Sequence, residues 1–265
     1  MRDGSLIILL YHGVDSGEGF AGQAEPHRRE YILRDRLFED HMGYLRARGY
    51  RVRPLGECLD RPREAVALTF DDGERSCHQT IAPLLERLGF RGDFFIVSRL
   101  IGTPGYLTAG DLKGLAANGH GIHSHSATHR CLTGLDPEGL EEELAGSKAD
   151  LEAITGTPVE FFSCPNGAFN SRVISAARRA GYDRVLTSVE GYNPSRGSPF
   201  LLKRFAMRAY TTTAGVAGIC ERRAATACKV AAKQIVTEAC KAVLPFACYD
   251  RLRTRLLQAC GKGWI

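Results

Sequence analysis

Short apolar runs alternate with helical patterns along this 265-residue chain, and no other feature constrains the fold as strongly. The runs expected to form strands are Leu6–Tyr11, Arg51–Arg53, Ala65–Phe70, Asp93–Val97, Gly121–His123, Glu160–Phe162, Arg184–Thr187 and Leu201–Met207. Helical patterns lie between them, many with a polar N-cap residue and a terminal glycine. Strands that alternate with helices form a mainly parallel sheet or a β/α barrel. Chemistry in such folds gathers at the carboxyl ends of the strands.

The charge divides the chain into two parts. We expect residues 1–213 to form the barrel and residues 214–265 to form a basic helical extension. Residues 215–265 hold nine Lys or Arg and three Asp or Glu, so the formal net charge of +5 resides in this extension. The nine cysteines include no C-x-x-C pair, which fits a reducing cytoplasm. The apolar run Leu6–Leu10 is typical of a strand rather than of a signal peptide, so a cytoplasmic location is expected.

Two adjacent carboxylates end the run Ala65–Phe70. Asp71 and Asp72 repel each other at the point where a buried strand surfaces. The pair becomes useful if one carboxylate binds a metal ion and the other stays free to act as a base, because the cation offsets the repulsion.

Four histidines within ten residues supply further metal ligands, in the segment GHGIHSHSATH. One carboxylate and two imidazoles with an open position are a common set for catalytic zinc. His125 and His129 are the expected pair. His123 is an alternative to His125, because residues two apart on an extended chain face the same way. We interpret His120 as structural.

Three motifs in this order resemble those of the NodB-homology polysaccharide deacetylases, carbohydrate esterase family 4. They are TFDDG (69–73), HSATH (125–129) and SCPNG (163–167), and the flanking segments YHGV, DFFIV, LTAGDLKGLAANGH and AGYDRVLTS also resemble that family. The resemblance covers residues 6–207. It implies a distorted (β/α) barrel of the NodB-homology type and metal-dependent removal of an acyl group from a sugar amide.

The resemblance also implies a role for each site residue. Asp71 would be the general base, while Asp72, His125 and His129 would bind Zn²⁺ or another divalent transition metal. The backbone N–H of Asn166 would stabilise the oxyanion together with the metal.

Two positions depart from the common family pattern. No histidine follows His129, so His12, after the first strand, is expected to protonate the departing amine, as in circularly shifted members of the family. The third motif begins with Ser163 where many members have an arginine that orients the base. Arg204 is the first candidate to replace that arginine, and Arg208 is the second.

The resulting hypothesis is an enzyme that removes N-acetyl groups from an amino sugar in a polysaccharide or a lipid-linked glycan. One alternative is a deformylase or another amide hydrolase of the same fold. A second is a catalytically degenerate carbohydrate-binding module. For the basic extension, residues 214–265, one interpretation is a helical pair that packs on the barrel with a solvated basic face. The other, which we test below, is peripheral contact with an anionic membrane surface. No nucleic-acid partner is expected, because aromatic residues do not interleave with its charges.

Overall fold

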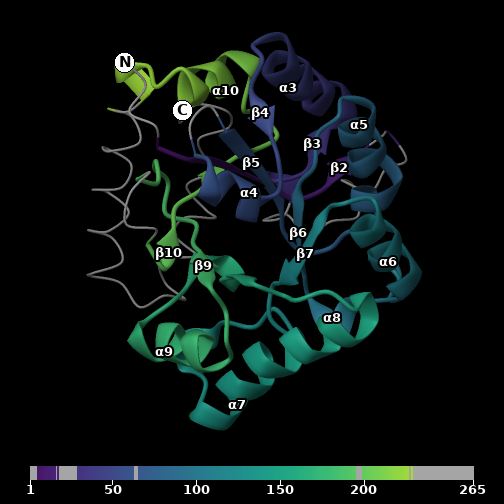
Figure 1. Ribbon diagram of the computed structural model, residues 1–265, viewed down its shortest axis with the longest axis vertical. Coiled ribbons are helices and arrows are strands. Elements are labelled where there is room, and N and C mark those ends of the chain that lie inside the picture. The colour runs from purple at the N-terminus through teal and green to yellow at the C-terminus, as the bar shows by residue number, and fades with distance from the viewer. Residues whose placement is uncertain are drawn as a thin grey trace.

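A curled, mainly parallel sheet with helices on its outer side forms the body of the protein (Figure 1). The computed structural model describes residues 5–15, 17, 29–62, 65–194, 199–226 and 228. Within these residues nine strands form one sheet: β1 (Ile7–Tyr11), β4 (Arg51–Val52), β5 (Ala65–Phe70), β6 (Asp93–Ile96), β7 (Gly121–Ser124), β8 (Phe161–Ser163), β9 (Arg184–Leu186), β10 (Leu201–Leu202) and β11 (Phe205–Ala206). The predicted β/α barrel is confirmed.

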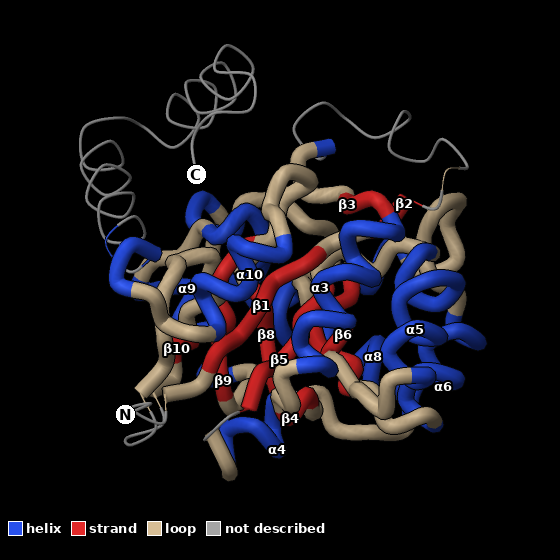
Figure 2. Tube along the Cα trace, turned by 90° about the horizontal axis from the view of Figure 1, so that it is seen from above, coloured by secondary structure: helices blue, strands red, loops and turns tan. Residues whose placement is uncertain are grey.

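Helices follow most of the strands and surround them in the view from above (Figure 2). The α-helices are α3 (Asp35–Ala47), α4 (Leu55–Asp60), α5 (Ala82–Arg87), α6 (Ala109–Ala117), α7 (Pro137–Glu141), α8 (Ser147–Thr155), α9 (Ser171–Arg179) and α10 (Thr213–Cys220). The described residues also contain two π turns, η1 (Cys77–Ile81) and η4 (Glu142–Gly146). They contain three 3₁₀ turns as well, η2 (Ser98–Leu100), η3 (Leu132–Gly134) and η5 (Pro165–Gly167). A separate two-stranded sheet joins β2 (Val14–Asp15) to β3 (Leu33–Arg34).

Polar side chains cap the N-termini of α6, α7 and α9. The hydroxyl of Thr108 accepts a hydrogen bond from the backbone N–H of Asp111, whose carboxylate accepts one from the N–H of Thr108 in return. The side chains of Asp136 and Asn170 cap α7 and α9 in the same way, each accepting a backbone N–H three residues on. These caps satisfy N–H groups that have no partner inside a helix.

One predicted strand, Leu201–Met207, is two strands in the structure. β10 pairs with β9, whereas β11 pairs with β1 at the other edge of the sheet. The segment therefore connects the two edges of the curled sheet, and Lys203 and Arg204 lie at the crossing. A run of apolar residues predicts extended chain but does not say which neighbour each residue will pair with.

Residues alternate between two hydrophobic clusters along the strands. Leu9, Val66 and Leu68 belong to the larger cluster, which also contains buried apolar residues of helices such as α3, α5 and α6. Ile8 and Ala67 belong to a smaller cluster that also includes Leu55 of α4 and Phe95. Because successive side chains of a strand point to opposite faces, the smaller cluster fills the inside of the curled sheet.

Helix α10 begins at the predicted boundary between the barrel and the extension. It packs on α3, and its residues Val216, Ile219 and Cys220 belong to the larger cluster. The division at residues 213 and 214 remains a prediction, and all but residue 228 of the extension beyond residue 226 lies outside the described residues. Among the described residues, no helix has the length and apolar character needed to span a bilayer.

Candidate active site

A buried arginine holds the first aspartate of the DDG segment. Asp71 follows β5 directly and is 3% exposed, and Arg204 is fully buried. The Arg204 Nη1 donates to Asp71 Oδ1 and Nη2 donates to Oδ2, both at 2.8 Å. The same guanidinium donates to the hydroxyls of Ser163 (2.8 Å) and Thr69 (3.4 Å), and its Nε donates to the carbonyl of Thr187 (3.0 Å). All five N–H groups of the guanidinium thus have acceptors, which fixes its position.

The arginine and its neighbours keep Asp71 ionised. Burial raises the pKa of the Asp71 carboxyl, but the positive charge of Arg204 outweighs burial, so the pKa lies below its ordinary value. Ser163 also donates to Asp71 Oδ2 at 3.0 Å, from the position where the family often has an arginine. Arg208, the second candidate, instead lies 3.7 Å from the carboxylate of Glu190 and 3.9 Å from that of Glu30.

The side chains of Asp72, His125 and His129 lie close together. Oδ1 of Asp72 lies 3.4 Å from Nε2 of His125 and 3.4 Å from Nε2 of His129. One potential ligand atom from each residue lies within 4.8 Å of the other two. Asp72 and His125 are buried, while the His129 side chain is 33% exposed and leaves one side open. One oxygen and two nitrogen donors in this arrangement fit a divalent transition metal.

The tautomer of His125 agrees with such a site. Its Nδ1 lies 2.8 Å from the carbonyl oxygen of Ser163, to which it donates, so in the neutral imidazole Nε2 carries the lone pair that a metal ion would bind. Burial lowers the pKa of His125, but the charges of Asp71 and Asp72 outweigh burial and raise it. Burial raises the pKa of Asp72, but hydrogen bonds from His125 and His129 lower it well below the ordinary value.

Strained backbone marks the same place. Asp72, Ser126, His129 and Asn166 adopt positive φ values of 76°, 66°, 63° and 56°. Side chains with a Cβ rarely adopt this conformation, and residues that do so cluster at functional sites, where surrounding contacts hold them.

His12 lies at the carboxyl end of β1 beside the carboxylates. Its ring packs on Tyr31 with centroids 4.7 Å apart. Burial lowers the pKa of His12, while the charges of Asp72 and Asp71 act on it in the opposite direction. Among the described residues its Nδ1 has no hydrogen-bond partner, although that atom is buried.

Asn166 lies in the exposed part of the turn η5, which follows β8, and is itself exposed. This turn comes directly after the strand that carries Ser163, so it lies at the same edge of the sheet. No hydrogen bond or ion pair within the described part of the chain joins Asn166 to the aspartates or the histidines.

The two other histidines of the segment have separate partners. Nε2 of His123 lies 3.3 Å from Oδ1 of Asp93, and its ring packs between Phe95 and Phe161. His120 accepts a hydrogen bond from the N–H of Gly92. Neither belongs to the group around Asp72.

Sequence reasoning did not assign the hydrogen bonds of Ser163 or the role of Glu143, a buried residue of η4 that contacts the loop carrying His129. The sequence identifies Ser163 only as the residue that stands where many family members have an arginine. Glu143 is one of three consecutive glutamates, and nothing in the residue pattern distinguishes it from the two exposed ones.

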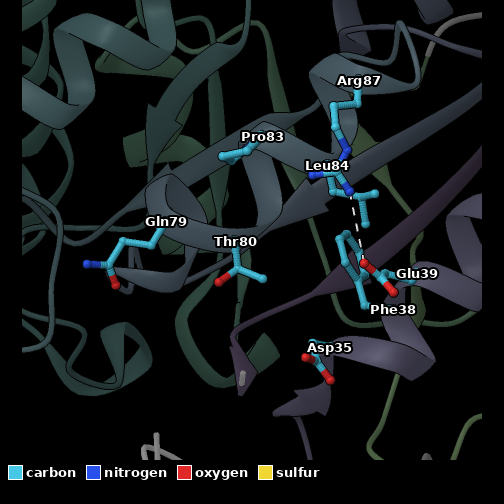
Figure 3. Close-up of a pocket in the computed structure, with 8 residues that line it drawn as sticks. All are labelled: Asp35, Phe38, Glu39, Gln79, Thr80, Pro83, Leu84 and Arg87. Atoms are coloured by element: carbon cyan, nitrogen blue, oxygen red, sulfur yellow. Dashed lines mark ion pairs between the residues drawn. The ribbon is translucent and has the colours of Figure 1, made fainter. Parts of the chain in front are cut away.

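A cavity of about 170 Å³ lies elsewhere, between α3 and the η1–α5 segment (Figure 3). Its lining includes Asp35, Phe38, Thr80 and Leu84, and none of the candidate active-site residues. Arg87 reaches across it to Glu39 at 4.0 Å. The cavity is thus separate from the site built on Asp71 and Asp72.

Comparison with known proteins relates part of the chain to one family. Residues 59–185 match the family model described as polysaccharide deacetylase. The chain carries a polysaccharide deacetylase domain. It is 29% identical over 197 residues to YxkH of Bacillus subtilis, which is named among the polysaccharide deacetylases, covering 72% of this chain and 67% of that protein. A peptidoglycan-N-acetylglucosamine deacetylase of Bacillus cereus is 30% identical over 124 residues, covering 46% of this chain and 56% of that protein.

Solved deacetylases share the fold of this deacetylase domain. A polysaccharide deacetylase from Bacillus cereus superposes with a TM-score of 0.72 and 23% identity, covering 82% of this chain and 69% of the other. A Streptococcus pyogenes deacetylase in complex with acetate also gives 0.72, with 19% identity and coverage of 82% and 98%. At these identities the similarity establishes the fold.

Proposed function

We propose that this chain is a metal-dependent N-deacetylase that removes acetyl groups from an amino sugar in a polysaccharide or a lipid-linked glycan. The observation that carries the proposal is the grouping of Asp72, His125 and His129 directly beside Asp71, which Arg204 holds in a bidentate ion pair. This grouping lies at the carboxyl edge of the sheet, in a chain with a polysaccharide deacetylase domain.

Asp72, His125 and His129 would hold the ion, with zinc as the expected metal. When bound, the ion would polarise the acyl carbonyl and lower the pKa of a water molecule. Asp71 accepts the proton of the attacking water, because its lowered pKa keeps it unprotonated. Arg204 aims the carboxylate, and Ser163 fixes one of its oxygens. The backbone N–H of Asn166 would donate to the oxyanion.

The second proton transfer falls to His12. Hydrolysis of an amide releases an amine, which must gain a proton as the C–N bond breaks. Burial lowers the pKa of His12, so the protonated imidazole gives up its proton readily. The carboxylates of Asp71 and Asp72 counteract burial and favour the charged form.

The proposal is tested by incubating the purified chain with N-acetyl and N-formyl amino sugars, free, oligomeric and lipid-linked. Mass spectrometry then measures amine release. Release from N-acetyl substrates supports the deacetylase. Release from N-formyl sugars alone would favour a deformylase, and binding without release would favour a carbohydrate-binding module. The Asp71→Asn variant is the control for contaminating activity.

Peripheral contact with an anionic membrane is a second proposal, supported by the charge of residues 215–265, nine basic against three acidic. A cytoplasmic location belongs with it. We expect the full chain to sediment with anionic but not with neutral liposomes, and to release as salt rises. Replacing Arg251, Arg253 and Arg255 by Gln should weaken sedimentation. No sedimentation at low salt would reject the contact.

A further inference from the structure

The loop that carries His129 needs support from outside itself. It runs from His125 at the end of β7 to Cys131, with no regular secondary structure. Ser126 and His129 both have left-handed backbone conformations, with φ values of 66° and 63°. Such conformations persist where surrounding contacts hold them. A metal ligand on this loop keeps its position only as well as those contacts do.

Glu143 supplies most of these contacts. It is fully buried, and its Oε2 accepts the backbone N–H groups of Ala127 (3.0 Å) and Thr128 (2.9 Å). Its Oε1 accepts the hydroxyl of Thr128 and the Nε of Arg130 (2.9 Å). Burial opposes the charged form, but these hydrogen bonds outweigh it and lower the pKa of the carboxyl. Four donors from residues on both sides of His129 therefore converge on one carboxylate.

The carboxylate itself is fixed by its place in a helix. Glu143 lies in the π turn η4, which joins α7 to α8 in one continuous helical segment. The next residue, Leu144, is fully buried in the core, and its carbonyl accepts the hydroxyl of Tyr182 at 2.8 Å. Single π turns inside helices occur frequently at functional sites. A rigid element thus holds the acceptor against which the loop is tied.

From these contacts we infer that Glu143 is a positioning residue that holds His129, and with it the ligand set, in the metal-binding arrangement. The inference rests on the proposed metal site. Glu143 acts through the loop. Its chemistry is specific, because an ionised carboxylate offers acceptors on both oxygens. A glutamine at this place keeps one acceptor oxygen and turns an NH₂ donor toward groups that also donate.

Metal titration of the full chain after treatment with a chelator tests the inference. Zn²⁺ reports affinity, and Co²⁺ reports ligand geometry through its visible absorption. We expect Glu143→Gln to weaken Zn²⁺ affinity by about 10–100-fold and to alter the Co²⁺ spectrum. The matched control is Asp93→Asn, another buried carboxylate that accepts a backbone N–H, from Leu55 at 2.8 Å. This control should lower the melting temperature and leave metal binding unchanged.

The same titration can also overturn the inference. If Glu143→Gln lowers only the melting temperature and retains the affinity and the spectrum, Glu143 is merely structural. If that variant does not fold, Thr128→Val replaces it, because it removes a single donor to Oε1. Wild-type metal affinity in Thr128→Val would then overturn the inference. If the unaltered chain binds neither metal, the proposed metal site itself fails, which is distinguishable from a failure of Glu143 alone.

Discussion

Two buried aspartate–histidine pairs stand in the same barrel, on strands that lie side by side. At the carboxyl edge, Asp72 lies 3.4 Å from His125. At the amino end of β6, Asp93 lies 3.3 Å from His123. The histidines are two residues apart on the chain, and the residue types and distances are nearly the same.

Their surroundings differ. The carboxyl-edge pair has a third donor in His129, a second carboxylate in Asp71, and strained backbone. The other pair is closed: Asp93 also accepts the N–H of Leu55 at the start of α4, and aromatic rings flank His123. The comparison teaches that residue types alone do not make a metal site. A metal site also needs a third ligand, here His129, that converges on the pair, and one side that stays open.

The largest expected difference between the pairs is in metal content. His125→Ala should lose the metal, because only two ligands remain, while His123→Ala should retain about one ion per chain. Elemental analysis of both purified variants measures this. Metal lost only in His123→Ala would place the metal site at the pair of Asp93 and His123 and contradict this assignment.

The next effect separates the two carboxylates of the open site. Asp71→Asn should reduce kcat by about 10²–10⁴-fold with metal retained, because an amide cannot accept the proton. Asp72→Asn should weaken metal binding itself. Turnover and metal content are measured on the same preparations. Equal metal loss in both variants would make Asp71 a ligand and place the base elsewhere.

A smaller effect concerns pH. The pKa of His125 is raised above its ordinary value of 6.5 by Asp71 and Asp72, against the effect of burial. Metal binding needs the neutral imidazole, so a raised pKa lets protons compete at higher pH. Below that pKa, Zn²⁺ affinity should fall roughly tenfold per pH unit for each proton displaced. Titrations between neutral and mildly acidic pH check this. The His123→Ala variant should give the same profile, and a flat profile in the unaltered chain would contradict the assignment.

The smallest effect belongs to the closed pair. Asp93→Asn should cost about 1–3 kcal/mol of unfolding free energy, because it weakens the buried acceptor for the N–H of Leu55. Urea denaturation measures the cost, and turnover should stay at the wild-type level. A stable protein with impaired turnover would mean that the two ends of the barrel are coupled.

Local patterns predicted much of the fold. The strand Ala65–Phe70 has the predicted bounds, and the polar N-cap residues that the helical patterns predict include Thr108, Asp136 and Asn170. Local signals suffice there because the helix caps bond within three residues and the strand is a continuous apolar run.

Long-range pairing could not be read in this way. The break between β10 and β11 depends on which strand each piece meets, β9 or β1. At the site, the motifs selected residues that the structure brings together around Asp72. The contacts of Ser163 with Asp71 and of Glu143 with Thr128 span 92 and 15 residues, and no local signal marks them.

The most direct test of the account restores metal to stripped protein and measures acetate release from an N-acetylglucosamine oligomer. We expect no release without metal, a rise with added Zn²⁺, and saturation at about one equivalent per chain. The Asp71→Asn variant should bind the same equivalent and stay inactive. Full release from the stripped protein, or release by Asp71→Asn at the wild-type rate, would contradict a metal-dependent deacetylase centred on these two aspartates.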